Sequence, residues 1–331
     1  MNDNLDIEIP ADLINFLRER GHIAVDEQPR ITVLAGGVSN RTVLVERASG
    51  EAWVLKQALA KLRVKADWFS SPERIHREAL GLRWLSTLAP TGTITPLIFE
   101  NHEHHLLAMQ AVPQPHENWK TMLLRGDVQR EHAIQFGGLL GTIHRQARAL
   151  RETLATAFAD TTFFESLRLE PYYGYSAQQV PAAAGFLNAL IAETRVQRMT
   201  IVHGDYSPKN VLVRDGRLIL LDHEVIHWGD PAFDLGFSLT HFLSKAHHLA
   251  EHRAAFVSAA QLYWQSYNDT SCESRAVRHT LACLLARVAG RSPLEYLDTQ
   301  ERARQQGAVV QLISENPATV PALIERFVAC L

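Results

Sequence analysis

The chain has 331 residues, of which 46% are hydrophobic and 21% are charged, and this is the composition and length of a globular protein with room for two lobes. Its net charge of −3 argues against a nucleic-acid or membrane-surface partner, because such partners select strongly basic chains. The 3 cysteines show no paired spacing, no run is long and apolar enough for a membrane helix, and the acidic N-terminus lacks a signal core. We therefore expect a cytoplasmic protein with reduced thiols.

The first third of the chain predicts a small antiparallel sheet with one inserted helix. A short helical pattern comes first, at residues 8–21. Five β-rich runs follow, broken by glycine-rich or polar turns, at residues 31–34, 42–45, 52–56, 97–99 and 105–111. Between the third and fourth runs, Pro72 opens a helical pattern that extends to Leu88. Residues 1–112 are therefore expected to form an N-terminal nucleotide-binding lobe.

The remainder, residues 113–331, is expected to form a larger helical lobe that carries catalysis and substrate binding. Proline-rich residues 113–115 predict a hinge. Helical patterns then cover residues 127–149, 180–195, 233–248, 251–268, 275–288, 299–314 and 318–330. One β-hairpin interrupts them, with Asp215-Gly216 as its turn between residues 210–213 and 218–221. Together the two lobes predict an α+β protein.

The most informative motif flanks this hairpin. It reads His-Gly-Asp205-Tyr-Ser-Pro-Lys-Asn210 before the hairpin and Asp222-His-Glu224 after it, which is the spacing of a kinase catalytic loop and its metal-binding loop. Asp205 is the candidate catalytic base, and Asn210 and Asp222 are candidate Mg²⁺ ligands, because Mg²⁺ prefers oxygen donors. Each residue alone would be read as an ordinary turn or strand cap. The joined pattern favours phosphoryl transfer from ATP.

Two acidic residues near the motif admit more than one interpretation. Glu224 follows Asp222 by two positions and is either a further metal-facing carboxylate or a solvated acid. Asp234, within the Asp-Pro-Ala-Phe-Asp segment, is predicted to be a buried acceptor that braces the catalytic loop.

Candidate nucleotide-binding residues lie in the first lobe. Lys56 ends a β-rich run, and Glu78 lies on the helix that follows. A lysine–glutamate pair that grips phosphates is favoured here over two surface charges, because the catalytic motif lies downstream. The Gly36-Gly37-Val38-Ser39-Asn40 segment is either a phosphate-wrapping turn or a plain hairpin turn.

Two further clusters have structural interpretations that compete with functional ones. His102, His104 and His105 lie between predicted strands, where a solvated turn is favoured over a metal site. Gly137, Gly138 and Gly141 fall on one predicted helix and are expected to allow close helix packing.

With Asp205, Asn210, Asp222, Glu224 and the segment up to Asp234, the chain resembles the aminoglycoside phosphotransferase and choline kinase family. The resemblance implies a two-lobed protein-kinase-like fold with ATP in a cleft between the lobes. It further implies that Lys56 and Glu78 form the ion pair of the N-terminal lobe, and that the hinge beside adenine comprises Met109, Gln110 and Val112.

Within that family, the Leu-Lys56 run and the segment from Arg74 to Glu78 resemble methylthioribose kinase. Ala-Arg287-Val-Ala-Gly is similar to that enzyme's paired-arginine segment with one arginine kept, which makes Arg287 a substrate-side candidate; the alternative is a helix-surface charge. Two positions depart from the family pattern. Ser207 replaces the usual histidine, and Lys209 replaces the usual glycine.

The expected activity is ATP- and Mg²⁺-dependent phosphorylation of a small-molecule hydroxyl on a sugar, an amino alcohol or an aminoglycoside-like polyol. The acceptor is expected over Asp205, near Trp228, Glu224 and Arg287. A protein substrate is disfavoured because no A-P-E motif follows Asp222. The alternatives are methylthioribose kinase itself, an aminoglycoside-resistance kinase, and an ATP-binding module without catalysis.

Overall fold

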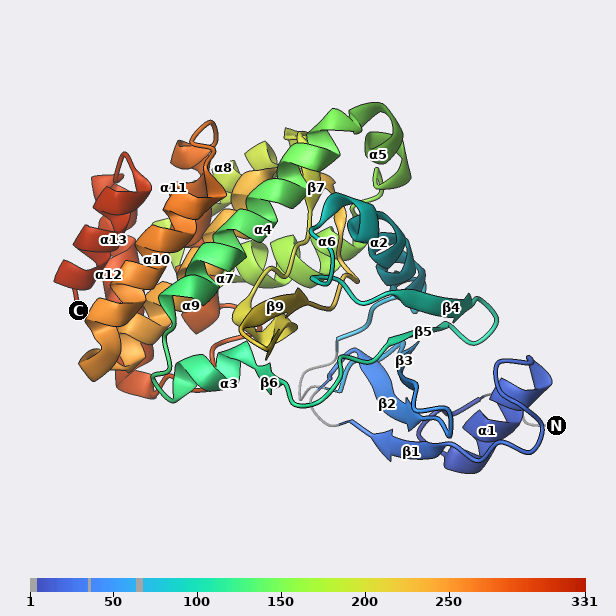
Figure 1. The fold of residues 1–331 in the computed structure, drawn as a ribbon. Helices are drawn as coiled ribbons and strands as arrows, with labels where there is room; N and C mark the ends of the chain where they lie inside the picture. Colours follow the sequence, from blue (N-terminus) through green and yellow to red (C-terminus); the bar gives the residue numbers. More distant parts are fainter. Residues whose placement is uncertain (1–4, 35–36, 64–67) are drawn as a thin grey trace. The chain divides into compact units, whose positions relative to one another are not determined.

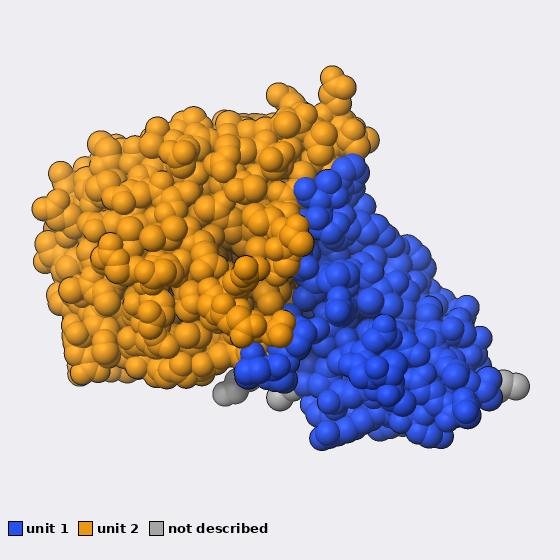
Figure 2. Space-filling view, in the orientation of Figure 1, with its two compact units in different colours: residues 1–87, 94–115 blue, residues 88–93, 116–331 orange. Residues whose placement is uncertain are grey.

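The computed structural model describes residues 5–34, 37–63 and 68–331. The chain divides into two compact units (Figure 2). Unit 1 comprises residues 1–87 and 94–115, and unit 2 comprises residues 88–93 and 116–331. Residues 88–93, which comprise the last residue of α2 (Arg74–Leu88) and the segment after it, are therefore grouped with the second unit.

Unit 1 is built on a five-stranded antiparallel sheet of order β1-β2-β3-β5-β4 (Figure 1). Its strands are β1 (Arg30–Val33), β2 (Asn40–Glu46), β3 (Ala52–Ala58), β4 (Leu97–Asn101) and β5 (Leu106–Gln110). Two helices accompany them, α1 (Pro10–Glu19) and α2 (Arg74–Leu88). The predicted sheet with one helix inserted between its third and fourth strands is therefore present.

Alternation along β3 decides which side chains meet which helix. Trp53 and Leu55 lie in an apolar cluster with α1, whereas Val54 packs on the cluster formed with α2. Because successive side chains of a strand point to opposite faces, Lys56 shares the α2 face with Val54. The sequence register of β3 thus directs this lysine towards the helix that carries Glu78.

Unit 2 is mainly helical (Figure 1). Its long helices are α4 (Arg130–Ala149), α8 (Pro181–Val196), α9 (Pro231–His248), α10 (Arg253–Tyr267), α11 (Glu273–Ala289), α12 (Thr299–Glu315) and α13 (Val320–Ala329). Helix α9 is buried from Pro231 to His247, because it packs against α10 and α11. A helix that is buried on all sides needs few charged residues, and this explains its apolar sequence.

Short elements complete unit 2. The hairpin strands β8 (Val211–Arg214) and β9 (Arg217–Leu220) pair with β6 (Glu117–Asn118), and β7 (Thr200–Val202) pairs with β10 (His227–Gly229). The short helices are α3 (Trp119–Leu124), α5 (Arg151–Ala157), α6 (Thr162–Phe164) and α7 (Tyr175–Gln179), and the 3-10 turns are η2 (Pro208–Asn210) and η3 (Ala250–His252). In the described part of the chain, no helix is long and apolar enough to cross a membrane.

The short helices α3, α5, α6 and α7 and one longer helical segment were not expected from the sequence. Residues Glu165–Gly174 form the π-helix η1, which contains Pro171. A wide helix with an internal proline has no 3.6-residue period, so the apolar spacing gave no helix signal there. This segment carries the buried side chains of Arg168 and Tyr172.

Helices α4 and α10 approach each other closely at two glycines. A Cβ atom at Gly137 would lie 2.2 Å from the Tyr263 carbonyl oxygen, and one at Gly141 would lie 2.5 Å from the Tyr267 carbonyl oxygen. A Cβ atom at Gly138 would meet nothing within 4 Å. The close-packing expectation is confirmed for Gly137 and Gly141 and is wrong for Gly138, which faces away from α10.

These adjacent glycines give a matched pair of variants. Gly137→Ala is expected to lower the free energy of unfolding by about 2–3 kcal/mol, because the methyl group displaces a backbone carbonyl. Gly138→Ala is expected to raise it by up to about 1 kcal/mol through helix propensity. Urea unfolding of both variants measures the difference, and equal stability of the two would contradict the packing.

Candidate active site

The predicted hairpin joins the two halves of the kinase-like motif, residues 203–210 and residues 222–224. Its turn residues Asp215 and Gly216 have φ angles of +50° and +71°, as an Asp-Gly turn between antiparallel strands requires. After β9, the Leu221 backbone N–H donates to the Asn210 carbonyl at 2.9 Å. The hairpin therefore brings Asp222 back to the end of the catalytic loop.

Asp234 holds the start of the catalytic loop. This side chain is fully buried and accepts the backbone N–H of His203 at 2.7 Å and that of Gly204 at 2.8 Å. One helical turn further along α9, the Ser238 hydroxyl donates to the Tyr206 carbonyl at 2.7 Å. The bracing role predicted for Asp234 is confirmed.

Glycine is required at position 204. Its φ angle is +77°, and a Cβ atom there would lie 2.9 Å from Val225 Cγ2. With that backbone shape, the Gly204 carbonyl accepts the Arg168 Nε–H at 2.8 Å. The tight loop thus attaches η1 directly beside Asp205.

The Asp205 carboxylate is buried and held by three nitrogen donors on one oxygen. Its Oδ2 atom lies 2.9 Å from Arg168 Nη2, 3.1 Å from Lys209 Nζ and 2.8 Å from Asn210 Nδ2. Burial alone would raise the pKa of Asp205, but the charges of Arg168 and Lys209 outweigh it and hold that pKa below its usual range. Asp205 is therefore ionised at neutral pH.

The three candidate metal ligands lie around this carboxylate in different states of burial. Asn210 uses its amide nitrogen for Asp205, so that its amide oxygen is the atom that can bind a cation. Asp222 is partly buried and has a φ angle of +68°, whereas Glu224 is buried. Glu224 is therefore not a solvated acid, and its charge and that of Asp222 both act on the Arg168 guanidinium.

The Tyr172 side chain lies close to both Arg287 and Arg168, the arginine that pairs with Asp205. It is buried on α11 and donates from Nη1 to the Tyr172 hydroxyl at 3.0 Å. The guanidinium groups of Arg287 and Arg168 lie 5.6 Å and 5.8 Å from the centroid of the Tyr172 ring. The surface-charge alternative for Arg287 is therefore wrong.

Lys245 is a second buried cation, close enough to Arg287 to feel its charge, and no sequence pattern pointed to it. It is fully buried on α9, donates to the His241 carbonyl at 3.3 Å and lies 5.3 Å from the centre of the Tyr296 ring. Among the described residues, no carboxylate forms an ion pair with it. Burial, and then the charges of Lys120 and Arg287, lower the pKa of Lys245 to about 7. Its position on a buried helix beside other cations became visible only in the fold.

Trp228 lies elsewhere in unit 2. It is buried on β10 and lines a cavity of about 240 Å³ with Arg151, Ala155, Ala159 and Arg198. No contact within the described residues joins Trp228 to Asp205 or Arg287. The structure therefore does not bring this predicted substrate residue together with the others.

In unit 1, the predicted lysine–glutamate pair is formed. Lys56 Nζ lies 2.6 Å from Glu78 Oε1, and the Glu78 side chain is fully buried. Both groups are on the α2 face of the sheet, as the alternation along β3 dictates. The pair places a cation and a carboxylate at a fixed position on this face.

The predicted glycine turn is only partly described. Gly36 lies outside the described residues, whereas Gly37, Ser39 and Asn40 are described, and Asn40 begins β2. The fully buried Arg74 at the start of α2 donates to the carbonyls of Ser39 and Leu59. This guanidinium ties the turn to α2, a contact that the sequence did not reveal.

The predicted hinge residues lie at the end of β5 and just after it. Met109 and Val112 are buried, and Gln110 is exposed with its backbone N–H bonded to the Pro96 carbonyl at 2.9 Å. Thr95 Oγ1 donates to Met109 Sδ at 3.3 Å. The two buried side chains thus belong to the apolar interior and Gln110 to the surface.

Asp230 begins α9 and supports the segment that holds Asp234. Its buried carboxylate accepts the Ala232 N–H at 3.0 Å and pairs with Arg275 Nε at 2.8 Å. Burial would raise its pKa, but hydrogen bonding and charge from His279, and the charge of Arg275, lower the pKa to about 2. The folded pKa lies below the unfolded value, so the stabilisation is present above about pH 4 and is lost as the pH falls towards 2.

We expect Asp230→Asn to lower the free energy of unfolding by about 2 kcal/mol at pH 7, because asparagine keeps the cap but loses the charge pair. The deficit should shrink as the pH falls from 5 to 2. Urea unfolding across this range measures it, with Asp215→Asn on the exposed hairpin turn as the neutral control. A deficit that is constant with pH would contradict the assignment.

Comparisons with known proteins agree with this arrangement. The model of the Phosphotransferase enzyme family matches residues 30–247. A methylthioribose kinase of Pectobacterium atrosepticum is 24% identical over 267 residues, covering 70% of this chain and 64% of that protein. One of Yersinia pseudotuberculosis is 25% identical over 266 residues, covering 70% and 63%. The chain thus spans less than two thirds of the length of these curated relatives.

Solved structures show the same fold. An amicoumacin kinase solved with AMP-PNP and Ca²⁺ has a TM-score of 0.59 at 14% identity, covering 92% of this chain and 94% of that one. The choline kinase of Streptococcus pneumoniae has a TM-score of 0.53 at 15% identity, covering 92% and 99%. The predicted protein-kinase-like α+β fold is therefore confirmed, and the chain belongs to the phosphotransferase enzyme family.

Proposed function

We propose that this chain transfers the γ-phosphoryl group of ATP to a hydroxyl group of a small molecule. The observation that carries the proposal is the buried, ionised Asp205, whose three nitrogen donors all bind Oδ2. Among the described residues none binds Oδ1, so that oxygen is available to a substrate. Family membership and relatives named as methylthioribose kinases support the proposal.

Asp205 would act as the general base. Its Oδ1 atom accepts the proton of the acceptor hydroxyl as that oxygen bonds to the γ-phosphorus and the bond from phosphorus to the bridging oxygen of ADP breaks. Arg168 and Lys209 keep the carboxylate ionised and oriented before the reaction. Lys209 is half-exposed, so its ammonium can also bind a phosphate oxygen.

The oxygen donors around Asp205 fit a Mg²⁺ ion. The Asn210 amide oxygen and the Asp222 carboxylate would hold it, and the neighbouring Glu224 is a further candidate. When bound, Mg²⁺ neutralises charge on the phosphates. In unit 1, we assign the phosphates to Lys56, held by Glu78, and to the turn of Gly37, Ser39 and Asn40. We assign adenine to Met109, Gln110 and Val112. A cytoplasmic location, where ATP and Mg²⁺ are supplied, fits this activity.

Two buried cations of unit 2, Arg287 and Lys245, favour an acceptor without positive charge. Arg287 is buried without a carboxylate partner among the described residues, and so is Lys245. A buried charge needs compensation, which hydroxyl or carboxylate oxygens of a substrate can supply. We therefore favour a sugar or a sugar acid over choline-like or aminoglycoside-like acceptors.

The activity is tested by ADP release with Mg²⁺ and ATP across matched acceptors: gluconate against sorbitol, ribonate against ribitol, and ribose, methylthioribose, choline and kanamycin. Turnover of polyols or sugar acids supports the proposal. Turnover confined to choline or kanamycin would refute the acceptor class. ATP binding without any turnover, including after an untargeted screen for metabolites that gain phosphate, would identify a binding module without catalysis.

For the acceptor found in this way, Arg287→Met is expected to raise KM by about 10-fold or more and to change kcat less, because the guanidinium contributes binding. The KM for ATP should stay unchanged. Arg291→Met is the matched control, since Arg291 is exposed and lies over Tyr175 at 5.2 Å. If both variants shift KM equally, Arg287 does not contact the acceptor.

A further inference from the structure

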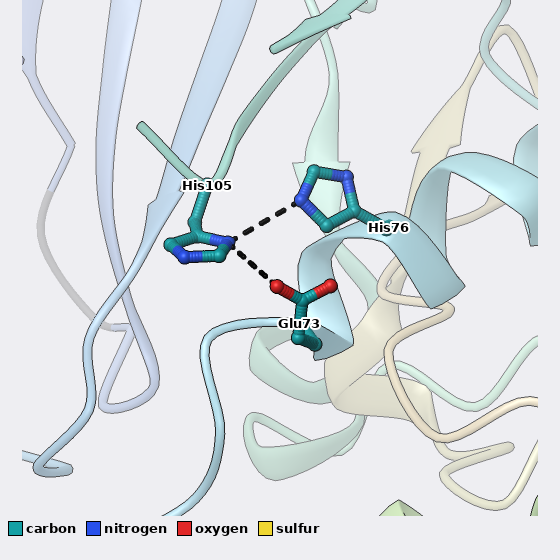
Figure 3. A group of neighbouring side chains, drawn as sticks. All are labelled: Glu73, His76 and His105. Carbon is teal, nitrogen blue, oxygen red and sulfur yellow. Dashed lines mark hydrogen bonds and ion pairs between the residues drawn. The ribbon is translucent and has the colours of Figure 1, made fainter. Parts of the chain in front are cut away.

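Three side chains in unit 1 converge at the start of α2, outside the groups assigned to phosphoryl transfer (Figure 3). Glu73 lies in the turn that precedes this helix, His76 lies in its first turn, and His105 lies on the turn between β4 and β5. The His76 backbone N–H donates to the Glu73 carbonyl at 3.0 Å, which keeps these two residues one tight turn apart. Nothing in the sequence pattern joins them to His105.

The spacing of their ligand atoms is that of a bound zinc ion. His105 Nδ1 lies 3.4 Å from His76 Nε2 and 3.4 Å from Glu73 Oε1. Ligands placed tetrahedrally at about 2.0–2.1 Å from Zn²⁺ lie about 3.4 Å from one another. All three ligand atoms lie within 4.8 Å of each other. A small movement of the exposed Glu73 side chain therefore brings its carboxylate oxygen to ligand spacing from both histidine nitrogens.

The surroundings of His76 fit a metal-bound imidazole. While Nε2 faces His105, Nδ1 faces Glu100 Oε2 at 3.7 Å. A carboxylate behind the second ring nitrogen is the usual partner of a histidine that ligates metal, because it fixes the tautomer and the ring orientation. The His102 ring stacks on His76 at a centroid distance of 3.9 Å and restricts the ring further.

A second set at the same place, His76, Glu100 and His102, is a poorer candidate. Its carboxylate already pairs with Arg83 at 2.9 Å, so the negative charge is compensated. The stacked rings of His76 and His102 also lie face to face at an interplanar angle of 11°. His104, which the sequence grouped with its neighbours, instead packs edge-on against Phe16 at 5.6 Å.

We propose that Glu73, His76 and His105 form a binding site for Zn²⁺ or a similar divalent transition metal, with a fourth position open to water. Such a site ties the first turn of α2 to the turn between β4 and β5. Glu78, which pairs with Lys56, follows His76 by two positions on the same helix. Metal binding therefore stabilises the part of unit 1 that positions this ion pair, and the site stands independently of the phosphotransferase activity.

The test is calorimetric titration of the chelator-treated full chain with ZnCl₂, together with Co²⁺ absorption spectra and thermal unfolding. We expect one Zn²⁺ per chain with a dissociation constant of about 10 µM or lower, tetrahedral Co²⁺ bands, and a Tm raised by several degrees at saturation. His105→Asn should abolish binding, since asparagine accepts the φ angle of +45° at this turn. Glu73→Gln, on an exposed side chain, should weaken binding about 10-fold or more without affecting the fold.

His102→Gln is the matched control and should leave Zn²⁺ binding unchanged. Loss of binding in His102→Gln with retention in His105→Asn would assign the metal to the second set and overturn the proposal. Binding weaker than about 100 µM, or equal in all four proteins, would show adventitious surface binding only and would overturn it as well.

Discussion

Replacing Asp205 by asparagine is expected to lower kcat by about 10²–10⁴-fold, the range by which a positioned general base contributes. Asparagine keeps the size and the Oδ1 atom of the side chain but cannot accept the proton of the acceptor hydroxyl. KM for ATP should change little, because the phosphates are assigned to other groups. Steady-state kinetics with the acceptor identified by the panel measures both parameters.

A structural effect of this substitution must be separated from the chemical one. Arg168 is buried and would lose one carboxylate partner, although the charges of Glu224 and Asp222 remain near it. Lys209→Met is the control, because it also removes a contact to Asp205 Oδ2 but leaves the base in place. Lys209→Met shows how much of the loss comes from this contact alone. If Asp205→Asn retains the kcat of the parent protein, Asp205 is not the base.

The pH profile gives a second check on Asp205. Its pKa lies below the usual range, so this carboxylate is deprotonated throughout the neutral range and keeps its charge to lower pH than an ordinary aspartate does. The acid limb of kcat/KM should therefore not lie between pH 5 and 7 on account of this group. An acid limb near pH 6 that disappears in Asp205→Asn would contradict the charges assigned around it.

Lys56→Met is expected to lower kcat/KM by about 10²-fold and the free energy of unfolding by about 3 kcal/mol. Both effects have one origin. The ammonium that is assigned to the phosphates also compensates Glu78, a carboxylate with no exposed surface. Removing the lysine takes away the positive charge that lies 2.6 Å from this buried carboxylate.

A double variant separates the two effects. Lys56→Met with Glu78→Gln removes both charges, so much of the lost stability should return, while kcat/KM stays low because no cation reaches the phosphates. Urea unfolding and steady-state kinetics on the same preparations measure this. If activity returns together with stability, the pair is structural and does not bind the nucleotide.

The sequence predicted the structure best where an element has a regular apolar period or lies in a recognisable motif. Strands β1 to β5, helix α2 and the hairpin of β8 and β9 follow from alternation and turn residues within a few positions. The role of Asp234 followed from its place beside the catalytic motif. Lys56 and Glu78 could be paired in advance because the downstream motif favoured the pair and the family resemblance implied it.

Elements without a regular period escaped prediction. The π-helix η1 carries Arg168 and Tyr172, and its wide turn and internal Pro171 break the apolar spacing. Strands β7 and β10 have only three residues each, which is too few for an alternating pattern to appear. Their positions are decided by pairing with each other and by the loop that Asp234 holds.

By itself, the amino-acid sequence determined the class of fold, the candidate catalytic carboxylate, the candidate metal ligands and the lysine–glutamate pair, since these follow from one spaced motif and from the family that it resembles. Only the tertiary structure decided what surrounds Asp205. Arg168 pairs with Asp205 from η1, and Arg287 reaches the same Tyr172 ring as Arg168 from α11. Lys245, on α9, is buried within reach of the Arg287 charge. The tertiary structure also decided the proximity of Glu73, His76 and His105. Residues that are far apart in the sequence and close in the fold leave no repeating pattern in the sequence. Their proximity could therefore not be predicted from neighbouring residues.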